Sequence, residues 1–349
     1  MRWDLFCRVI DNHGDLGVCW RLAADLASRG EQVRLWVDDP SALAWMAPRG
    51  APGVSLVCWA EPLPVVEPGD VVIEAFGCDP PAAFVSRMAA QATPPVWINL
   101  EYLSAEPYVD RSHGLPSPQL QGAGAGLTKW FFYPGFTPTS GGLLLGAQAP
   151  ADDSTAWLAA QGVPLREGER RVSLFAYADA PLHELFDRLD SEPTLLLLTA
   201  GAAQAPALAL LNAQRRRGQH LRAHALPWLD QAGYDHLLHA CDINFARGED
   251  SIVRAMAPGA PFVWQIYAQA DGAHAIKLDA LLTRFLAHAA PALAADVRTL
   301  WRAWNRLGAW PAALPEAKAW RAVCAAWRQH LAAQDDLSTR LLSFVAAKQ

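Results

Sequence analysis

The amino-acid sequence predicts an α/β protein with two doubly wound domains. Short apolar segments of strand length alternate with amphipathic segments of helix length, and this series occurs once in each half of the chain. Such alternation is typical of a parallel sheet that is covered by helices. The length of 349 residues also fits two domains of about 150 residues each. We therefore expect two Rossmann-like domains.

The first half of the chain contains five segments with the composition of buried strands. They are residues 3–10, 32–37, 54–59, 71–76 and 95–99. After the first of them, Val18, Leu22 and Leu26 form one apolar stripe of a helix. Further helical segments lie at 40–47 and 81–91. Because helices separate most of the strands, the strands are expected to run parallel.

Between Glu101 and Gly146 the alternation is interrupted by sequence rich in aromatic residues, proline and glycine. We expect a long ordered loop there, and ordered loops of this length usually have a function. Its aromatic side chains either line a partner or interdomain surface or form a small satellite core. They are Tyr102, Trp130, Phe131, Phe132 and Phe136.

The second half repeats the architecture of the first. Its strand segments are 171–177, 194–200, 219–226, 241–246 and 261–267, and its helical segments include 181–190, 203–217 and 231–239. We assign residues 1–155 to an N-terminal Rossmann-like domain and residues 156–330 to a C-terminal Rossmann-like domain. The C-terminal helix at 330–349 is a candidate to pack back on the first domain.

Composition and charge exclude several classes of protein. The formal net charge of -6 argues against a nucleic-acid binder and fits a protein with a basic partner. The six cysteines show no CxxC or CxxH spacing, so neither a zinc site nor a disulfide framework is expected. No signal sequence or membrane span is evident, and we expect a cytoplasmic protein. The absence of G-x-G-x-x-G and Walker motifs weakens a dinucleotide or P-loop interpretation.

The stretch from Asp242 to Ser251 predicts a strand, a sharp turn and a helix. In such a turn the first N–H groups of the helix can hold an anion, Ser251 can add a hydroxyl, and Arg247 can clamp phosphate oxygens. Glu249 fits such a site only if it serves a cationic group. The alternative is a helix capped by Asp250 or Ser251 with Arg247 and Glu249 as a surface pair.

A second polar loop follows the first strand segment. It consists of Asp11, Asn12, His13, Gly14 and Asp15. Open α/β sheets bind their ligands at the carboxyl ends of their strands, and two carboxylates at this position indicate a functional loop. The alternative is that Asp11 caps the helix while Asp15 is solvated. Two domains facing a cleft, with carboxylates on one and an anion site on the other, favour a GT-B type glycosyltransferase.

Long motifs in both halves of the chain narrow this class. They are DNHGDLGVCWRLAADLA at 11–27, KWFFYPGFTPTSGGLL at 129–144, NFARGEDSIVRA at 244–255 and PFVWQIYAQADGAHAIKLDALL at 261–282. These segments resemble the elongation factor P arginine rhamnosyltransferases, the EarP family, and the resemblance extends over essentially the whole chain. It implies an inverting enzyme that moves L-rhamnose from TDP-β-L-rhamnose to one arginine of bacterial elongation factor P.

The resemblance also implies a set of site residues. The catalytic residues that it implies are Asp11, Asp15 and Glu249. The substrate-binding residues are Asn12, Gly14, Phe175, Tyr177, Gln231, Tyr234, Arg247, Gly248, Asp250 and Ser251, with the aromatic residues and Gln231 around thymine. Three positions depart from the family pattern, namely His13, Tyr234 and Gln265. No metal and no cofactor beyond the donor is implied.

The implied partners are the donor and the N-terminal domain of elongation factor P, which carries the acceptor arginine; nucleic acid and membrane are not expected. A guanidinium has a pKa above about 12, so paired carboxylates would have to bind it, polarise it and accept a proton as the new bond forms. Two other classes remain open. One is another GT-B nucleotide-sugar enzyme, such as a different transferase or an epimerase, and the other is a non-catalytic protein that binds an elongation factor.

Overall fold

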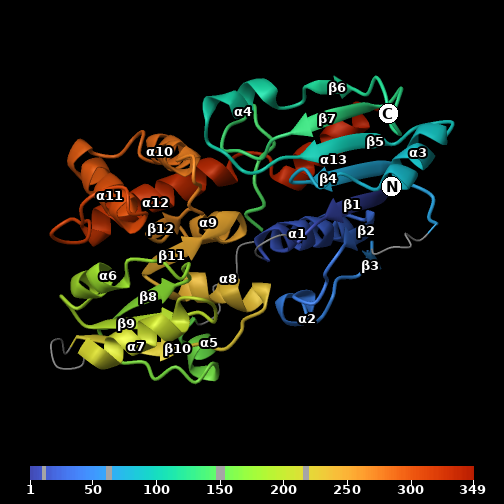
Figure 1. Ribbon diagram of the computed structural model, residues 1–349. Coiled ribbons are helices and arrows are strands. Elements are labelled where there is room, and N and C mark those ends of the chain that lie inside the picture. Colours follow the sequence, from blue (N-terminus) through green and yellow to red (C-terminus); the bar gives the residue numbers. More distant parts are fainter. Residues whose placement is uncertain (10–12, 60–64, 147–153, 215–219) are drawn as a thin grey trace. The chain divides into compact units, whose positions relative to one another are not determined.

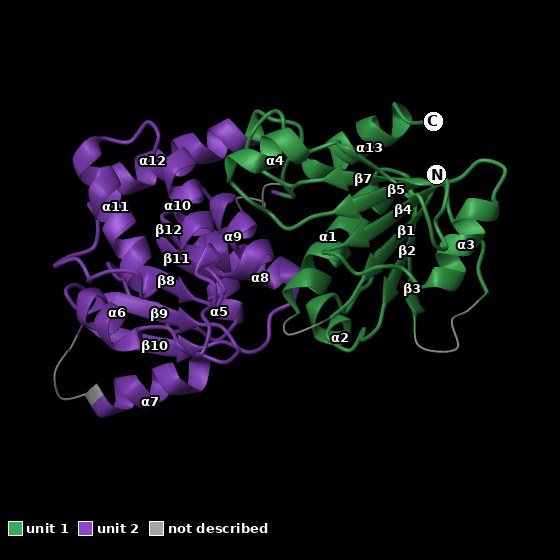
Figure 2. Ribbon diagram, turned by 45° about the horizontal axis from the view of Figure 1, so that its top comes forward, with its two compact units in different colours: residues 1–144, 332–349 green, residues 145–331 purple. Residues whose placement is uncertain are grey.

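The computed structural model describes residues 1–9, 13–59, 65–146, 154–214 and 220–349 (Figure 1). The chain forms two compact units, shown in separate colours in Figure 2. Unit 1 contains residues 1–144 and 332–349, and unit 2 contains residues 145–331. Each unit is built on a largely parallel sheet, which confirms the prediction of two Rossmann-like domains.

The sheet of unit 1 has seven strands in the order β3-β2-β1-β4-β5-β7-β6. The strands are β1 (Arg2–Cys7), β2 (Gln32–Val37), β3 (Val54–Cys58), β4 (Val71–Ala75), β5 (Val96–Leu100), β6 (Pro116–Pro118) and β7 (Thr128–Phe132). The helices of this unit are α1 (Gly14–Ser28), α2 (Leu43–Met46), α3 (Ala82–Ala90), α4 (Pro107–Ser112) and α13 (Leu337–Ala346). The strands were predicted from 3–10, 32–37, 54–59, 71–76 and 95–99, so only β6 and β7 are additional.

Helices cover both faces of this sheet because its strands alternate side chains between two cores. In β1, Leu5 belongs to a core that includes residues of α1, α2 and α13. The next residue along the chain towards the carboxyl end, Phe6, belongs to a second core that α3 completes. Successive side chains of a strand point to opposite faces, so an unbroken apolar strand requires cover on both sides. The continuous apolar sequence of β1 thus accounts for the layered fold.

The prediction of an ordered loop from Glu101 to Gly146 is wrong in part. Strand β7 lies within this segment and pairs in parallel with β5, and β6 pairs with β7 in antiparallel orientation. Phe132 is fully buried in the core of unit 1, whereas Tyr102 is exposed. Proline and glycine on either side of β7 obscured a five-residue strand, because short apolar runs between turn residues give little periodicity.

The sheet of unit 2 has five parallel strands in the order β10-β9-β8-β11-β12. They are β8 (Arg170–Leu174), β9 (Thr194–Leu198), β10 (Leu221–Ala225), β11 (Ile243–Arg247) and β12 (Phe262–Gln265). The helices are α5 (Ser154–Ala160), α6 (Leu182–Leu189), α7 (Gln204–Gln214), α8 (Gln231–Ala240), α9 (Gly248–Met256), α10 (Ala273–Phe285), α11 (Pro291–Trp304) and α12 (Ala317–Ala332). Leucines of β9 pack with α5 and α8, and two tryptophans of α11 pack on Phe245 and Phe262.

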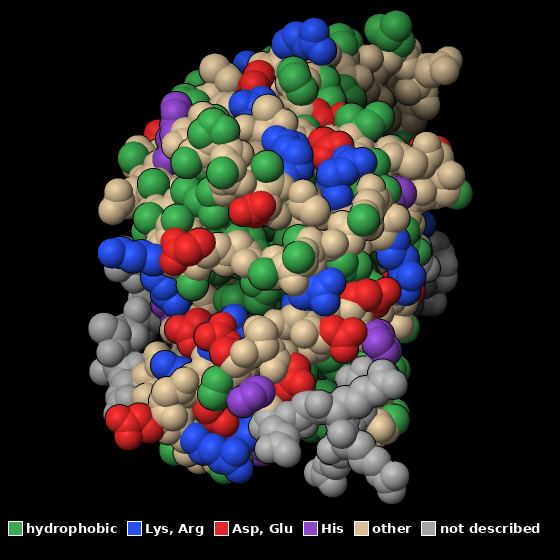
Figure 3. Space-filling view, turned by 90° about the vertical axis from the view of Figure 1, so that its left-hand side faces the viewer, with side chains coloured by type: hydrophobic (Ala, Val, Ile, Leu, Met, Phe, Trp, Pro, Cys, Tyr) green, Lys and Arg blue, Asp and Glu red, His purple; other side chains and the backbone are tan. Residues whose placement is uncertain are grey.

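The surface mixes charges of both signs. Figure 3 shows acidic and basic side chains interspersed on one face of the molecule, as expected from 29 basic and 35 acidic residues. Among the described residues, no helix is long and apolar enough to cross a membrane.

One buried carboxylate ties the strands of unit 1 together at their amino ends. Asp4 of β1 is fully buried. Its two oxygens accept hydrogen bonds from the guanidinium of Arg34, from the indole N–H of Trp36 and from the backbone N–H of Gly69, with donor–acceptor distances of 2.7 Å. A buried charge is tolerated only when it is paired and hydrogen-bonded, and four donors meet that requirement here.

We predict that Asp4→Ala lowers the free energy of unfolding of unit 1 by about 3 kcal/mol, because Arg34 and two buried N–H groups lose their acceptor. Denaturant titration followed by tryptophan fluorescence measures the change. The control is Asp70→Ala, which removes an exposed acceptor of the Arg2 N–H and is expected to cost less than about 1 kcal/mol. Equal effects of the two substitutions would contradict the role assigned to Asp4.

Candidate functional site

Several of the predicted site residues lie where the strand order of each sheet reverses. In unit 1 the order reverses between β1 and β4, and in unit 2 it reverses between β8 and β11. Ligands of open α/β sheets bind beyond the carboxyl ends of the strands at such a switch point, because the connections diverge there and leave a crevice. Asp15 follows β1, Phe175 and Tyr177 follow β8, and Arg247 ends β11.

The junction between β11 and α9 contains no loop residue. The strand ends at Arg247 and the helix begins at Gly248, which has a positive φ of 69°. The turn predicted over 247–251 is therefore shorter than expected, and the N-cap is Arg247 rather than Asp250 or Ser251. Glu249, Asp250 and Ser251 lie in the first turns of α9, where backbone N–H groups without intrahelical acceptors favour an anion.

The Arg247 guanidinium lies against two aromatic rings. Its central carbon is 4.6 Å from the ring centroid of Phe175 and 4.6 Å from that of Tyr177. The pKa of Arg247 is lowered from its ordinary value by burial, and the nearby Tyr177 and Tyr234 offset only part of this effect. Contact with two rings keeps the planar guanidinium in one orientation. Binding of phosphate oxygens then costs little side-chain conformational entropy.

An aromatic cluster continues from these two rings. Tyr234 of α8 lies edge-on to Phe175 at 5.7 Å, and Tyr267, which follows β12, lies edge-on to Tyr177 at 5.7 Å. Gln231 is the first residue of α8, one turn before Tyr234. The structure therefore brings the side chains of Phe175, Tyr177, Tyr234 and Arg247 together. Such a cluster has the flat apolar surfaces that a nucleobase stacks on.

Two residues that sequence reasoning left without a role support this cluster. The Gln265 side chain accepts a hydrogen bond from the Tyr177 backbone N–H at 2.8 Å and donates one to Asp179 at 3.3 Å. The Trp264 indole donates to the Gly248 carbonyl at 2.9 Å. Both are buried in β12 and fix backbone beside Arg247. No local pattern identifies them, because their partners are far away in the sequence.

Glu249 has a cationic partner in unit 2. Lys277 of α10 donates to its carboxylate at 2.7 Å, and both side chains are about one-fifth exposed. This pair explains how a carboxylate is accommodated at the same helix end as a predicted anion site, since the ammonium compensates its charge. The structure does not show the alternative, a surface pair between Arg247 and Glu249. Arg247 lies against Phe175, and Glu249 pairs with Lys277.

In unit 1, Asp15 lies in the first turn of α1, after His13 at the N-cap and Gly14. The Tyr102 hydroxyl donates to its carboxylate at 3.3 Å. The His13 ring lies edge-on to Trp45 at 6.0 Å. The other two predicted residues of this loop, Asp11 and Asn12, lie outside the described residues. In the part of the chain that is described, no group of three or more His, Cys, Asp or Glu side chains is arranged to hold a metal ion.

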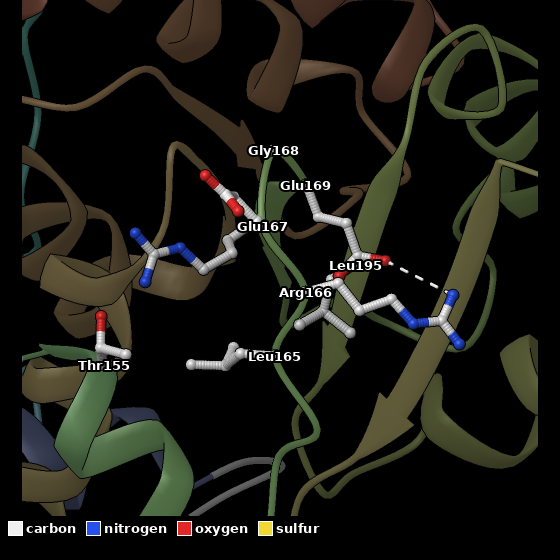
Figure 4. Close-up of a pocket in the computed structure, with 8 residues that line it drawn as sticks. Thr155, Leu165, Arg166, Glu167, Gly168, Glu169 and Leu195 are labelled. Atoms are coloured by element: carbon white, nitrogen blue, oxygen red, sulfur yellow. Dashed lines mark ion pairs between the residues drawn. The ribbon is translucent and has the colours of Figure 1, made fainter.

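A hollow in unit 2 lies away from the predicted site. Its volume is about 310 Å³, and Figure 4 shows its lining: Thr155, Leu165, Arg166, Glu167, Gly168, Glu169, Arg171 and Leu195. Arg171 and Leu195 are the second residues of β8 and β9, so the hollow lies at the amino ends of these strands. Glu169 there pairs with Arg166 at 3.9 Å and with Arg222. The candidate site lies at the carboxyl ends of the strands, so the hollow is separate from it.

Solved structures share the architecture of the chain. A structure described as "Structural basis for EarP-mediated arginine glycosylation of translation elongation factor EF-P" aligns with a TM-score of 0.64 and 30% identity, and covers 100% of this chain and 99% of the other. The glycosyltransferase VinC aligns over all of both chains with a TM-score of 0.54 and 14% identity, which shows a common fold. The architecture is that of the GT-B glycosyltransferases, as predicted.

Sequence comparison defines the family. Residues 3–346 match the family "Elongation-Factor P (EF-P) rhamnosyltransferase EarP". A protein-arginine rhamnosyltransferase of Pseudomonas putida is 42% identical, with 98% of each chain covered, and one of Pseudomonas aeruginosa is 40% identical, with 99% of this chain and 98% of the relative covered. The corresponding protein of Neisseria meningitidis is 33% identical, with 99% and 97% covered. The chain belongs to the EarP family of elongation factor P rhamnosyltransferases, which confirms the resemblance seen in the motifs.

We predict that Gly248→Ala destabilises unit 2 by about 1 to 2 kcal/mol, because a side chain disfavours the positive φ of 69°. Steric contact contributes little, since the nearest atom to an added Cβ is the Tyr177 hydroxyl oxygen at 3.6 Å. Thermal unfolding measures the effect. The control is Gly14→Ala, where an added Cβ meets no atom of the described residues within 4 Å and the residue is helical, so no loss is expected. An unchanged melting temperature for Gly248→Ala would contradict this view of the junction.

Proposed function

We propose that this protein transfers L-rhamnose from TDP-β-L-rhamnose to an arginine side chain of elongation factor P with inversion at the anomeric carbon. The observation that carries the proposal is family membership across residues 3–346, together with relatives named protein-arginine rhamnosyltransferase that align over nearly their whole length. The predicted residues at both switch points support it. A translation factor as the acceptor supports a cytoplasmic location for the proposed reaction.

The donor is assigned to unit 2. The rings of Phe175, Tyr177 and Tyr234, with Gln231 at the start of the same helix as Tyr234, form the proposed thymine site. Arg247, the first N–H groups of α9 and the Ser251 hydroxyl form the proposed diphosphate site, and Gly248 lets the backbone approach the phosphates. Positive charge and oriented dipoles at this place stabilise the leaving TDP as the glycosidic bond breaks. This division requires neither a metal nor another cofactor.

The acceptor is assigned to unit 1. An arginine remains protonated at neutral pH, so its nitrogen has to lose a proton while it attacks. Asp15 and Asp11 are assigned to pair with the guanidinium, to draw its positive charge away from the attacking nitrogen and to accept that proton. The nitrogen forms a bond to the anomeric carbon, the bond from that carbon to the TDP oxygen breaks, and TDP leaves with the electron pair.

Glu249 is assigned a role beside the transferred sugar. Its carboxylate lies in the first turn of α9 and is held by Lys277. A fixed carboxylate at this place can orient sugar hydroxyls and stabilise the positive charge that develops on the sugar ring. Asp250 lies beside it in the same turn and is assigned to the ribose end of the donor.

The proposal is tested by incubating elongation factor P with the enzyme and TDP-β-L-rhamnose and measuring the intact mass of the factor. One deoxyhexosyl group should be added to an arginine, and the reaction should continue in EDTA. Asp15→Asn should lower kcat about 100-fold or more, since a positioned proton acceptor is lost. Asp25→Asn on the same helix, where Asp25 pairs with Arg29, is the matched control and should react normally. An unmodified factor with the unaltered enzyme, or activity that requires magnesium, would contradict the proposal.

We also predict that Lys277→Met weakens TDP binding about 10-fold, because Glu249 would then repel the diphosphate without compensation. Calorimetric titration with TDP measures the loss. The double variant Glu249→Gln, Lys277→Met should recover most of it, since the repelling charge is also gone. The matched control is Lys318→Met, which removes an exposed lysine of α12. A double variant as weak as the single one would show that Lys277 contacts the phosphates itself and would overturn the compensating role.

A further inference from the structure

An aromatic pair lies beside Asp15 at the carboxyl edge of the sheet in unit 1. Strands β1, β4 and β5 are neighbours in this sheet. Asp15 follows β1, Phe76 follows β4 directly and Tyr102 follows β5, so the parallel strands bring the three residues to one edge. Phe76 was assigned no role from the sequence, and Tyr102 was considered only among the aromatic residues of a partner surface or a satellite core.

The two rings form a stacked pair with one exposed member. Their centroids are 4.6 Å apart and their planes differ by 21°. Tyr102 remains 40% exposed although Phe76 stacks on it, and its hydroxyl donates to the Asp15 carboxylate at 3.3 Å. A flat apolar surface and a carboxylate at its edge are thus presented together.

The backbone at Phe76 is in an unfavourable conformation. Phe76 has a positive φ of 58°, and its N–H donates to the Leu100 carbonyl at 2.8 Å, which holds this turn against β5. A bulky residue rarely adopts the left-handed region, and glycine would adopt it without strain. Backbone strain of this kind is concentrated at functional sites. An aromatic ring at a position suited to glycine indicates that the ring itself is needed there.

We propose that the Phe76–Tyr102 pair is the surface on which the guanidinium of the acceptor arginine stacks, and that Tyr102 selects arginine over lysine. A guanidinium is planar and stacks on aromatic faces while its N–H groups point outward in its own plane. Asp15 lies at the hydroxyl end of the Tyr102 ring. There, two N–H groups of a stacked guanidinium would donate bidentate hydrogen bonds to the Asp15 carboxylate. A lysine ammonium has no flat face, so it cannot stack on the ring and present two parallel N–H groups to the carboxylate.

This inference rests on the proposed function, because it assumes that an arginine is the acceptor. It adds a specificity-determining residue to that site. Tyr102 also orients Asp15 through its hydroxyl, and the ring and the hydroxyl can be tested separately.

The first measurement titrates elongation factor P at saturating TDP-β-L-rhamnose. Tyr102→Leu should raise the KM for elongation factor P about 10-fold, since the stacking surface is lost. Tyr102→Phe keeps the ring, so its KM for elongation factor P should stay within about 2-fold of that of the unaltered enzyme. The dissociation constant for TDP should not change in either variant. The matched control is Tyr108→Leu, which removes a tyrosine of α4 that is 38% exposed and packs edge-on against Tyr133.

The second measurement uses the unaltered enzyme and compares binding of elongation factor P with its acceptor Arg→Lys form. The arginine form should bind about 10-fold more tightly, and Tyr102→Leu should remove the difference. Equal binding of the two forms, an unchanged KM in Tyr102→Leu, or equal losses in Tyr102→Leu and Tyr102→Phe would overturn the inference. A failure of the proposed function is separate, because it appears as an unmodified mass of elongation factor P with the unaltered enzyme.

Discussion

The junction at Arg247 and Gly248 constrains the whole candidate site in unit 2. The chain leaves β11 and enters α9 without an intervening residue, which the positive φ of Gly248 makes possible. The last strand residue thereby lies beside the first N–H groups of the helix. Strand β8 is the neighbour of β11 in the sheet. The rings of Phe175 and Tyr177, which follow β8, therefore lie against the Arg247 guanidinium. Arginine, amides and rings are placed together by this one junction.

Both units use the same property of a parallel sheet. Strands that are neighbours in space present their carboxyl ends at one edge, so residues far apart in the sequence meet there. In unit 1 this brings Tyr102 to Asp15, and in unit 2 it brings Phe175 to Arg247. At the edge of unit 1 a carboxylate and rings suit a cationic acceptor, whereas at the edge of unit 2 an arginine and helix amides suit an anionic donor.

The parts of the site that sequence reasoning predicted are those with local patterns. The strand before Arg247, the helix after it and the position of Asp15 after the first strand follow from apolar periodicity and polar residues at strand ends. The roles of Gln265, Lys277 and the Phe76–Tyr102 pair were not predicted, because each depends on a partner in another element. Strand β7 was missed since proline and glycine flank its five residues. Contacts between elements that are far apart in the sequence decide these features, and no local pattern in the sequence encodes such contacts.

Hydrogen exchange with and without TDP tests whether the switch point of unit 2 binds the nucleotide. We expect slower exchange of backbone amides at 247–251 and 175–177, because these segments carry the proposed diphosphate and thymine contacts. Amides around the hollow at 165–169, at the other end of the same sheet, should not change. Protection at 165–169 with none at 247–251 would contradict nucleotide binding at the switch point.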